Sequence, residues 1–450
     1  MRKLITIIAA AVLTAALGAQ AATYTWDNGN GNNLWGTAAN WVGDPALTFG
    51  NQADIIFNSA DVVTRGNAVS INGPRTIRSL TINANYETQN NATFDIRTYD
   101  TFSATARILT FTNASGNASI NVAQSTAGTV QVRLGSSDGG NVVLNSHLDL
   151  AQNNTFFNAT GFQFESKVSG AGTINKTGAG LVRMVRDNSA WSGGMNINQG
   201  EVAVFSDPKA MGTGLWTLGG GANNTKFSVG STAVQANSGG LTVAAGTGTR
   251  TIALMSTTSG NTGLGGAITL NKDAIFDVGS YVAGTHDRLT AQGAISGTGG
   301  INKTGTGILQ LNGTNTYAGN TTVSVGELFL SDNAGLTFVI GASNVNNKVT
   351  GNGKGTFNGD FYFNLTSAGT TVGDSWTVED LAGTVAYGTS FSVNGFTDAG
   401  SDLWTKNIAG SKYYEFSETT GILTVIPEPA TIGMLGLGAI ITMLIRRMRI

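Results

Sequence analysis

The stretch VSGAGTINKTGAGLVRMVRDNSAWSGGMNINQGEVAV, residues 168–204, decides the fold because the chain contains a second copy of it. The second copy, residues 295–330, reads ISGTGGINKTGTGILQLNGTNTYAGNTTVSVGELFL. Aromatic and glycine positions correspond along the whole length of the two copies. The matching pairs are Ile174 and Ile301, Gly180 and Gly307, Trp191 and Tyr317, Gly193 and Gly319, and Gly200 and Gly326. A recurring unit of this length indicates an array of similar stacked units.

Within each copy, short strand patterns alternate with glycine. Leu309 and Leu311 alternate with Gln310, and the same alternation occurs outside the repeats in VQVRL at 130–134. A period of two residues is typical of half-buried strands, and glycine supplies the positive φ angles of tight corners. One such unit cannot cover its own apolar face, so neighbouring units must stack. The sequence therefore predicts an all-β fold, a right-handed parallel β-helix or β-solenoid, with aliphatic residues inside and Asn, Thr and Ser outside.

The two segments resemble autotransporter-associated β-strand repeats. That family closes its unit with an aromatic residue, a Ser/Thr/Ala-Gly step and a β-branched strand, and the second copy has this pattern complete. In the first copy, Met195 and Asn196 stand where the second copy has a pair of threonines.

Composition excludes several classes of function. The 450 residues include 63 Gly, 5 Pro and no Cys, with 41% hydrophobic and 12% charged residues. Low charge argues against disorder, and the lack of cysteine excludes disulfides and Cys-based metal sites. The formal net charge of −2 includes basic residues at both termini, so the body between them is mildly acidic. Such a body has no electrostatic footprint for nucleic acid, and we expect no nucleic-acid partner.

The N-terminus predicts a secretory signal peptide over residues 1–21. Arg2 and Lys3 precede an apolar run from Leu4 to Gly18. A small-x-small site for signal peptidase follows. Its residues are Ala19 and Ala21, and the mature protein would begin at Ala22. The alternative is an uncleaved anchor helix, which the short apolar run disfavours.

Residues 427–450 predict a sorting signal with a transmembrane helix. The uncharged stretch from Ala430 to Ile445 can span a membrane if the flanking arginines snorkel. The flanking residues are Pro427, Glu428 and Pro429 before the stretch, and Arg446, Arg447 and Arg449 after it. Two prolines around one residue disfavour helix and sheet, so we expect an extended, unpaired segment that a processing enzyme can bind. The arginine cluster favours retention on the cytoplasmic side.

This order of Pro-Glu-Pro, short apolar helix and arginine cluster resembles the PEP-CTERM sorting signal of Gram-negative bacteria. The resemblance implies handling by an exosortase, a membrane protease that cuts near the Pro-Glu-Pro and releases the body or transfers it to the cell surface. The alternative is a permanent tail anchor. In both cases the body is exported.

Composition divides the body into three parts. Residues 22–165 would form an N-terminal cap and the first solenoid coils, residues 166–335 the solenoid with both repeats, and residues 336–426 a small antiparallel β module rich in aromatic residues. The open ends of a solenoid expose core and backbone edges and need a cap. Three tryptophans near the start fit that role, and the alternative is a platform that stacks against sugars. They are Trp26, Trp35 and Trp41.

Candidate catalytic residues are few. The nearest approach to a pair of carboxylates is Asp374 with Glu379 and Asp380, which we interpret as residues of a solvated turn and strand edge rather than as a glycosidase acid and base. The two histidines, His147 and His286, have no serine nucleophile motif beside them. Neither zinc-ligand spacing nor a calcium loop is present. We therefore expect no catalysis, no cofactor and no metal.

The sequence favours an exported structural or adhesion protein of the cell surface or extracellular matrix. The resemblances suggest exopolysaccharide or neighbouring surface proteins as partners. The alternative is a secreted carbohydrate-binding or carbohydrate-active β-helix protein. Clustered carboxylates on adjacent coils would favour an enzyme, whereas a surface lined uniformly with Asn, Thr and Ser would favour the structural role.

Overall fold

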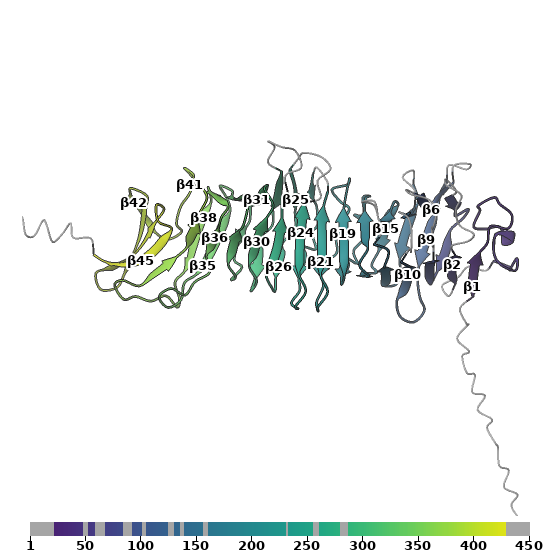
Figure 1. Ribbon diagram of the computed structural model, residues 1–450, viewed down its shortest axis with the longest axis horizontal. Helices are drawn as coiled ribbons and strands as arrows, with labels where there is room; N and C mark the ends of the chain where they lie inside the picture. Colours follow the sequence, from purple (N-terminus) through teal and green to yellow (C-terminus); the bar gives the residue numbers. More distant parts are fainter. Residues whose placement is uncertain are drawn as a thin grey trace, which may run out of the picture.

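The computed structural model describes residues 22–47, 53–58, 68–83, 92–100, 105–124, 130–135, 139–155, 161–230, 233–254, 261–279 and 287–428. Within these ranges the regular secondary structure is almost entirely β-strand, and the one helix is the short 3-10 helix η1 (Ala38–Asn40). Figure 1 shows the strands stacked across the long axis of an elongated body, with the first and the last described strands at opposite ends of the stack.

Face 1 of this body is a parallel sheet of eleven strands, continued by a parallel sheet of three. The eleven strands are β1 (Thr23–Trp26), β2 (Asp54–Asn58), β5 (Ser79–Asn83), β10 (Ala118–Val122), β13 (Leu148–Gln152), β16 (Ile174–Thr177), β18 (Met195–Ile197), β20 (Trp216–Leu218), β23 (Leu241–Val243), β26 (Ile268–Leu270) and β29 (Ile295–Gly297). The three are β32 (Thr314–Asn315), β35 (Gly335–Val339) and β38 (Asp360–Asn364).

Face 2 is one parallel sheet of thirteen strands. They are β3 (Ala68–Ser70), β6 (Ala92–Arg97), β11 (Val130–Leu134), β14 (Phe162–Phe164), β17 (Leu181–Met184), β19 (Gly200–Val204), β21 (Thr225–Val229), β24 (Arg250–Leu254), β27 (Ala274–Asp277), β30 (Ile301–Thr304), β33 (Thr321–Val323), β36 (Val349–Gly351) and β40 (Glu379–Leu381).

Face 3 consists of a four-stranded and a seven-stranded parallel sheet. The first has β4 (Arg75–Ile77), β9 (Ile108–Phe111), β12 (Asn141–Leu144) and β15 (Lys167–Gly170). The second has β22 (Val234–Gln235), β25 (Asn261–Leu264), β28 (Arg288–Ala291), β31 (Ile308–Leu311), β34 (Glu327–Leu330), β37 (Lys354–Phe357) and β41 (Val385–Tyr387). A small antiparallel hairpin, β7 (Tyr99–Asp100) and β8 (Thr105–Ala106), projects beside them.

Along most of the body the chain visits the three faces in turn, so that each turn stacks on the one before. Between β15 and β22 the strands alternate between faces 1 and 2. After β26 on face 1, β27 lies on face 2 and β28 on face 3, and β29 then returns to face 1 beside β26. Side chains alternate as the sequence predicts: Ile268 and Leu270 are buried, whereas Thr269 between them faces outward. The predicted all-β parallel solenoid is confirmed, and its handedness stays a prediction.

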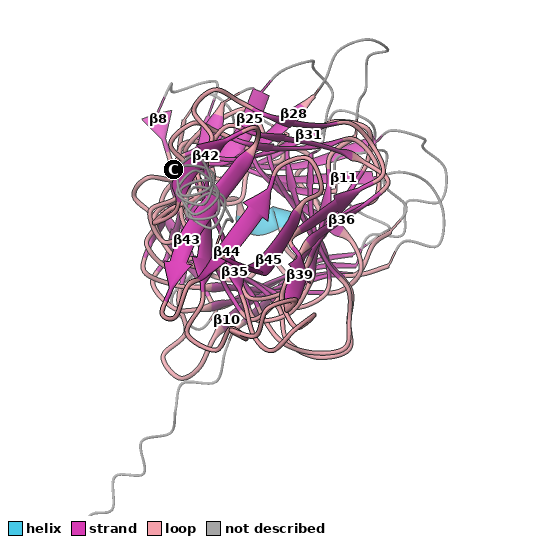
Figure 2. Cartoon of the chain, turned by 90° about the vertical axis from the view of Figure 1, so that its left-hand side faces the viewer, coloured by secondary structure: helices cyan, strands magenta, loops and turns pink. Residues whose placement is uncertain are grey.

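The N-terminal end of the solenoid is closed by tryptophan side chains. Trp26, Trp35 and Trp41 are at most 1% exposed, and their rings meet edge to face. The indole Nε1 of Trp41 donates a hydrogen bond to the carbonyl oxygen of Trp35 at 2.8 Å. Figure 2 looks along the body and shows η1 close to the solenoid axis. The cap interpretation fits, because a buried indole offers no face to a sugar.

The C-terminal end is closed by a five-stranded antiparallel sheet. Its strands are β39 (Ser375–Thr377), β42 (Thr397–Gly400), β43 (Leu403–Ile408), β44 (Lys412–Ser417) and β45 (Ile422–Pro427). The predicted antiparallel module is therefore present. It begins later than residue 336, because β35 to β38, β40 and β41 still pair in parallel with the preceding turns. Phe361, one of the aromatic residues that suggested a separate module, belongs instead to the buried core of the last turns, where its ring centroid lies 5.1 Å from that of Phe357.

The Pro-Glu-Pro segment differs from the sequence expectation. Pro427 is the last residue of β45, in register with Lys412 of β44, and the backbone N–H of Glu428 donates to the carbonyl oxygen of Ser411 at 2.8 Å. The expected unpaired segment is thus wrong for these two residues. Proline lacks an N–H but keeps its carbonyl acceptor, which is sufficient at the end of a strand.

No helix long and apolar enough to cross a membrane occurs among the residues that the structure describes. The predicted transmembrane helix at 430–445 lies outside those residues, as do the predicted signal peptide at 1–21, Pro429, Arg446, Arg447 and Arg449. Ala22 opens the described chain and is exposed.

Candidate functional site

The two copies of the repeat fold alike but occupy different faces. In the first copy β16 and β18 stack on face 1 and β17 and β19 stack on face 2, with Ile174 opposite Met195. In the second copy β30 and β33 stack on face 2 and β31 and β34 stack on face 3, with Ile301 opposite Thr321. Each copy therefore consists of two layers. Two successive strands on adjacent faces form the first layer, and the next two strands of the copy pair with them to form the second. The second copy is rotated by one face about the solenoid axis relative to the first.

A buried lysine joins the two layers of each copy at the corner. Lys176 donates from Nζ to the carbonyl oxygens of Gly178 at 2.5 Å and Gln199 at 2.7 Å. Lys303 donates to the carbonyl oxygens of Thr304, Gly305 and Val325 at 2.7, 2.7 and 3.1 Å. Both side chains are 0% exposed. Burial lowers the pKa of Lys176 to about 7 and that of Lys303 to about 8.

A buried asparagine ties each copy to the turns on either side. The Asn188 side chain accepts a hydrogen bond from the N–H of Val168 at 2.8 Å and donates to the carbonyl oxygen of Ala210 at 2.7 Å. Asn315 accepts from the N–H of Ile295 at 3.0 Å and donates to the carbonyl oxygen of Gly335 at 2.9 Å. These side chains satisfy backbone groups inside the solenoid that water cannot reach.

Sequence reasoning missed both of these roles. The period-two pattern carried a signal for the lysines, because Lys176 and Lys303 occupy the inward phase set by Ile174 and Ile301. The alternation of inward and outward residues gives no signal for Asn188, because this residue lies between strands. The one signal available for that residue was its recurrence as Asn315 in the second copy.

Face 1 presents a continuous outward row of small polar side chains, here called the face 1 row. Each strand of its eleven-stranded sheet contributes one residue in the same register. The row is Thr23, Asp54, Ser79, Ser119, Asp149, Asn175, Asn196, Thr217, Thr242, Thr269 and Ser296. Parallel pairing with no change of register keeps the row continuous along the body.

The two carboxylates of the face 1 row are held by neighbouring side chains. Asp54 pairs with Arg78, whose Nε lies 3.0 Å from its Oδ1, and accepts a hydrogen bond from Ser79 at 2.6 Å. Asp149 accepts hydrogen bonds from the amides of Asn117 and Asn175 at 3.0 and 2.9 Å. The other end of the row differs, because the hydroxyls of Thr217, Thr242, Thr269 and Ser296 make no side-chain hydrogen bond to any described residue.

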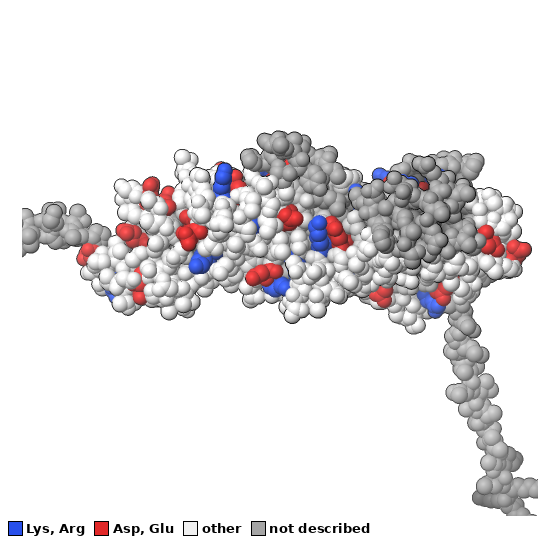
Figure 3. Space-filling view, viewed as in Figure 1, with Lys and Arg blue, Asp and Glu red and all other residues white. Residues whose placement is uncertain are grey.

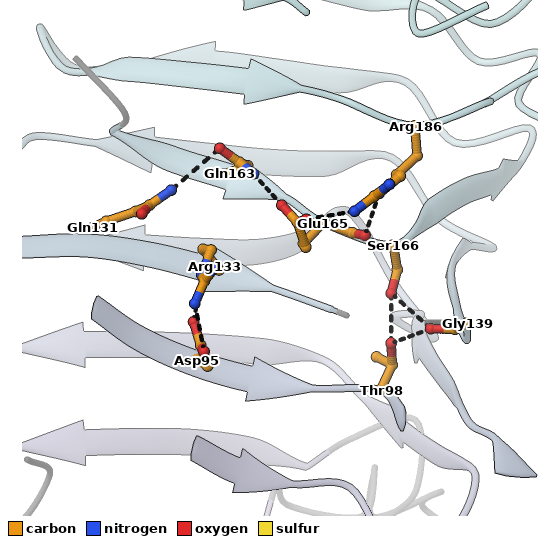
Figure 4. A network of polar contacts seen from close by, with 9 residues as sticks. All are labelled: Asp95, Thr98, Gln131, Arg133, Gly139, Gln163, Glu165, Ser166 and Arg186. Atoms are coloured by element: carbon orange, nitrogen blue, oxygen red, sulfur yellow. Dashed lines mark hydrogen bonds and ion pairs between the residues drawn. The ribbon is translucent and has the colours of Figure 1, made fainter. Parts of the chain in front are cut away.

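Two arginine–carboxylate pairs lie at the strands of face 2 or just after them, in the N-terminal half of the chain, and Figure 4 shows both. Arg133 donates to both carboxylate oxygens of Asp95 at 2.6 and 2.8 Å. Arg186 donates to the side chain of Glu165 at 2.5 Å, and Gln163 donates to the other oxygen of the same carboxylate. Each of these two carboxylates is therefore held by its own arginine.

Figure 3 shows that charged side chains on one side of the molecule occur singly or in pairs of opposite sign, separated by uncharged surface. Glu201 and Lys226 on neighbouring strands of face 2 form such a pair at 3.4 Å. Within the described residues, no group of three or more His, Asp or Glu side chains could hold a metal ion.

The candidate catalytic residues are not brought together as a site. Asp374 accepts a hydrogen bond from the N–H of Thr371 within a turn, and Asp380 is exposed on β40. The interpretation of Glu379 as a solvated residue is wrong, because its side chain points inward and the residue is 6% exposed. Burial raises the pKa of its carboxyl, which accepts the N–H of Leu381 at 2.6 Å.

One of the two histidines, His147, lies among the described residues. The Nδ1 atom of His147 accepts the N–H of Thr173 at 3.0 Å, which ties it to the next turn of the solenoid. His286 lies outside the described residues.

Comparison with known families finds the repeat. Residues 174–204 and 301–328 match the Passenger-associated-transport-repeat. The first match runs from the start of β16 to the end of β19, and the second from the start of β30 into β34, so each covers the two-layer unit described above. The match supports an exported surface or extracellular protein. No curated protein and no solved structure matches the chain.

Proposed function

We propose that this protein is an exported, non-catalytic β-solenoid of the cell surface or extracellular matrix, with a structural or adhesive role. Its body is a rod closed at both ends, and its surface is lined with Asn, Thr and Ser rather than with clustered carboxylates. The face 1 row carries the proposal, because eleven consecutive strands expose small polar side chains in one register. Such a surface offers many equivalent weak contacts instead of one concentrated site.

The terminal signals complete this proposal. Signal peptidase would remove residues 1–21, and an exosortase would act near Pro427, Glu428 and Pro429, with the arginine cluster retained on the cytoplasmic side. The Passenger-associated-transport-repeat matches support export in general, and the exosortase step rests on the sequence of the C-terminus.

The test is the intact mass of the protein purified from the surface fraction of cells that make the full chain. We expect a species that begins at Ala22 and ends within a few residues of Pro429. A species that retains Ile450 in the membrane fraction would replace exosortase processing with a permanent anchor. Recovery only from the cytoplasm would refute the proposed function.

A secreted glycosidase is the competing function. It requires a carboxyl group with a raised pKa beside a carboxylate on the solenoid surface. Asp95 and Glu165 are each paired with arginine, and Glu379 is buried among core residues. Release of reducing sugar from neutral and acidic polysaccharides by the purified protein would contradict the non-catalytic role.

A further inference from the structure

The face 1 row has the geometry of a binding surface for one class of polymer. We propose that it binds a neutral, linear polysaccharide that lies along the long axis of the solenoid. This inference rests on the proposed function only because an exported protein meets such polymers. The binding itself is a property of the folded rod and can be measured separately.

The first argument is the direction and spacing of the row. Neighbouring strands of a sheet lie about 4.8 Å apart, so the row presents one polar group at that interval along the body. Buried partners fix each group, as Trp216 and Leu218 do on either side of Thr217. A sugar polymer extended along the row would meet a hydrogen-bonding group at each turn.

The second argument is the hydroxyl groups at the C-terminal end of the row. Thr217, Thr242, Thr269 and Ser296 are consecutive, outward-facing and without a side-chain hydrogen bond to any described residue. A hydroxyl can donate one hydrogen bond and accept two, which suits the hydroxyls of a sugar in either orientation. This end of the row therefore has hydrogen-bonding capacity that the fold itself does not use.

The third argument is charge. The row contains no lysine or arginine, and its two carboxylates, Asp54 and Asp149, already accept hydrogen bonds from neighbouring side chains. A polyanion would find no cation on the row and would approach a mildly acidic body. A second copy of this chain would bring two acidic bodies together. Charge therefore favours a neutral polymer over an acidic polysaccharide or another copy.

The row also contains no aromatic residue, and this sets how binding depends on length. Without a ring to stack against the sugar, each contact is a single hydrogen bond that replaces one to water, so its net contribution is small. Affinity must come from many contacts along one chain. Long polymers should bind, and short oligosaccharides of the same sugar should bind only weakly.

The experiment compares two triple variants of the full-length protein. Thr217→Val, Thr242→Val and Thr269→Val remove three hydroxyls from face 1 and keep the shape of the side chain. The matched control, Thr251→Val, Thr322→Val and Thr350→Val, removes three partly buried outward hydroxyls from face 2. Circular dichroism checks that both keep the strand signal of the wild type.

Binding is measured by affinity electrophoresis in gels that contain hydroxyethylcellulose, galactomannan, dextran or alginate. We expect at least one neutral polymer to retard the wild type, with a dissociation constant that rises at least tenfold, roughly, in the face 1 variant. The face 2 variant should stay within about twofold of the wild type. Alginate should cause no retardation.

Four results would overturn the inference. They are retardation by none of the neutral polymers, equal loss in both triple variants, equal retardation by alginate, and tight binding of a short oligosaccharide. Sedimentation equilibrium supplies a further one: self-association that only the face 1 variant abolishes would make the row a contact between copies. A cytoplasmic location would refute the proposed function and leave these binding results intact, so the two failures can be told apart.

Discussion

The two copies of the repeat have closely similar sequences and yet face in different directions. The first occupies faces 1 and 2 and the second occupies faces 2 and 3. In both, a buried lysine binds the corner carbonyls, and a buried asparagine ties the copy to its neighbouring turns. What the repeat specifies is a local stack of strands with its internal hydrogen bonds, and not a surface of the molecule.

The copies differ in how they fill the space beside that stack. The first lies where face 3 has no strand, since residues 185–194 and 205–215 form loops between β15 and β22. Trp191 fills this region, packs against Trp216 with ring centroids 6.1 Å apart, and donates to the carbonyl oxygen of Gly172 at 2.8 Å. In the second copy Tyr317 occupies the sequence position that corresponds to Trp191, and its hydroxyl oxygen lies 2.5 Å from the hydroxyl oxygen of Thr321.

The largest expected effect comes from removing these rings. Trp191→Ala should lower the free energy of unfolding by about 4 kcal/mol and Tyr317→Ala by about 3 kcal/mol, because both side chains are fully buried and the cavity beside two loops is larger. Urea unfolding monitored by circular dichroism measures both. Trp191→Phe, which keeps most of the volume, should recover more than half of the loss. A larger loss at Tyr317 would show that the loops of the first copy collapse into the space.

The corner glycines should show that the two copies are equivalent. Gly200 and Gly326 have φ angles of 73° and 79°. An added Cβ would lie 2.6 and 2.8 Å from the Nζ of their buried lysines, and 2.6 and 2.4 Å from the carbonyl oxygens of Gly178 and Gly307. Replacement by alanine should cost about 3 kcal/mol in each copy, from strained backbone and from displacement of the lysine and the corner carbonyls.

Gly31→Ala is the matched control for this pair. Gly31 has a φ of 72° and nothing within 4 Å of an added Cβ, so it isolates the backbone term at about 1 kcal/mol. Equal losses at all three glycines in urea unfolding would mean that the contacts with the lysine and the corner carbonyls contribute nothing.

The buried lysines should distinguish the copies by pH. Lys176→Met and Lys303→Met should each cost about 2 kcal/mol, because they leave backbone carbonyls without donors. Burial lowers the folded-state pKa from 10.5 to about 7 for Lys176 and to about 8 for Lys303. Between these values and 10.5 the unfolded chain binds the extra proton, so the stability of the wild type rises with pH over that window.

Each methionine variant loses this rise. The destabilisation measured by urea unfolding should therefore be greater at pH 9.5 than at pH 6, and the difference should be larger for Lys176. Lys272→Met is the control, because Lys272 also donates to two corner carbonyls, of Gly246 and Gly248, but is partly exposed. A destabilisation independent of pH at both buried lysines would contradict the lowered pKa values.

The smallest expected effect concerns the surface of the copies. Glu201 lies 3.4 Å from Lys226 and accepts a hydrogen bond from Ser228 at 2.5 Å, whereas the matching Glu327 has no ion pair among the described residues. Glu201→Gln should cost at most about 0.5 kcal/mol, lost at 1 M salt, and Glu327→Gln should cost nothing measurable. Thermal unfolding at two salt concentrations checks both, and a salt-independent loss at Glu201 would argue for packing instead.

Much of the architecture could be predicted from the sequence, because alternation and repetition are direct consequences of stacked strands. Leu309 and Leu311 point inward as their spacing requires, and the tryptophans near the start close the first turn. The boundary near residue 336 could not be placed, since dense aromatic residues are equally compatible with a separate module and with wide final turns. Phe357 and Phe361 belong to the latter.

The polar interior was harder to predict than the apolar one. Lys176 occupies an inward phase, but a lysine there is expected to be excluded unless backbone carbonyls accept its hydrogen bonds. Some of those carbonyls are local, but those of Gln199 and Val325 belong to a corner one turn further along the solenoid, a relation that spacing along the chain does not reveal. The face 1 row was hard to predict for the same reason. Its residues are brought into register by solenoid turns of different length, so they have no constant spacing along the chain.

The position of β45 has a mechanical consequence. This strand lies between β39 and β44, pairs antiparallel with both, and ends at Pro427. Antiparallel hydrogen bonds run perpendicular to the strand, so a pull on the C-terminal tail along β45 would load both ladders in shear, all bonds together, instead of peeling them one at a time. A rod tethered by that tail would transmit tension into its closing sheet and resist extraction of its last strand.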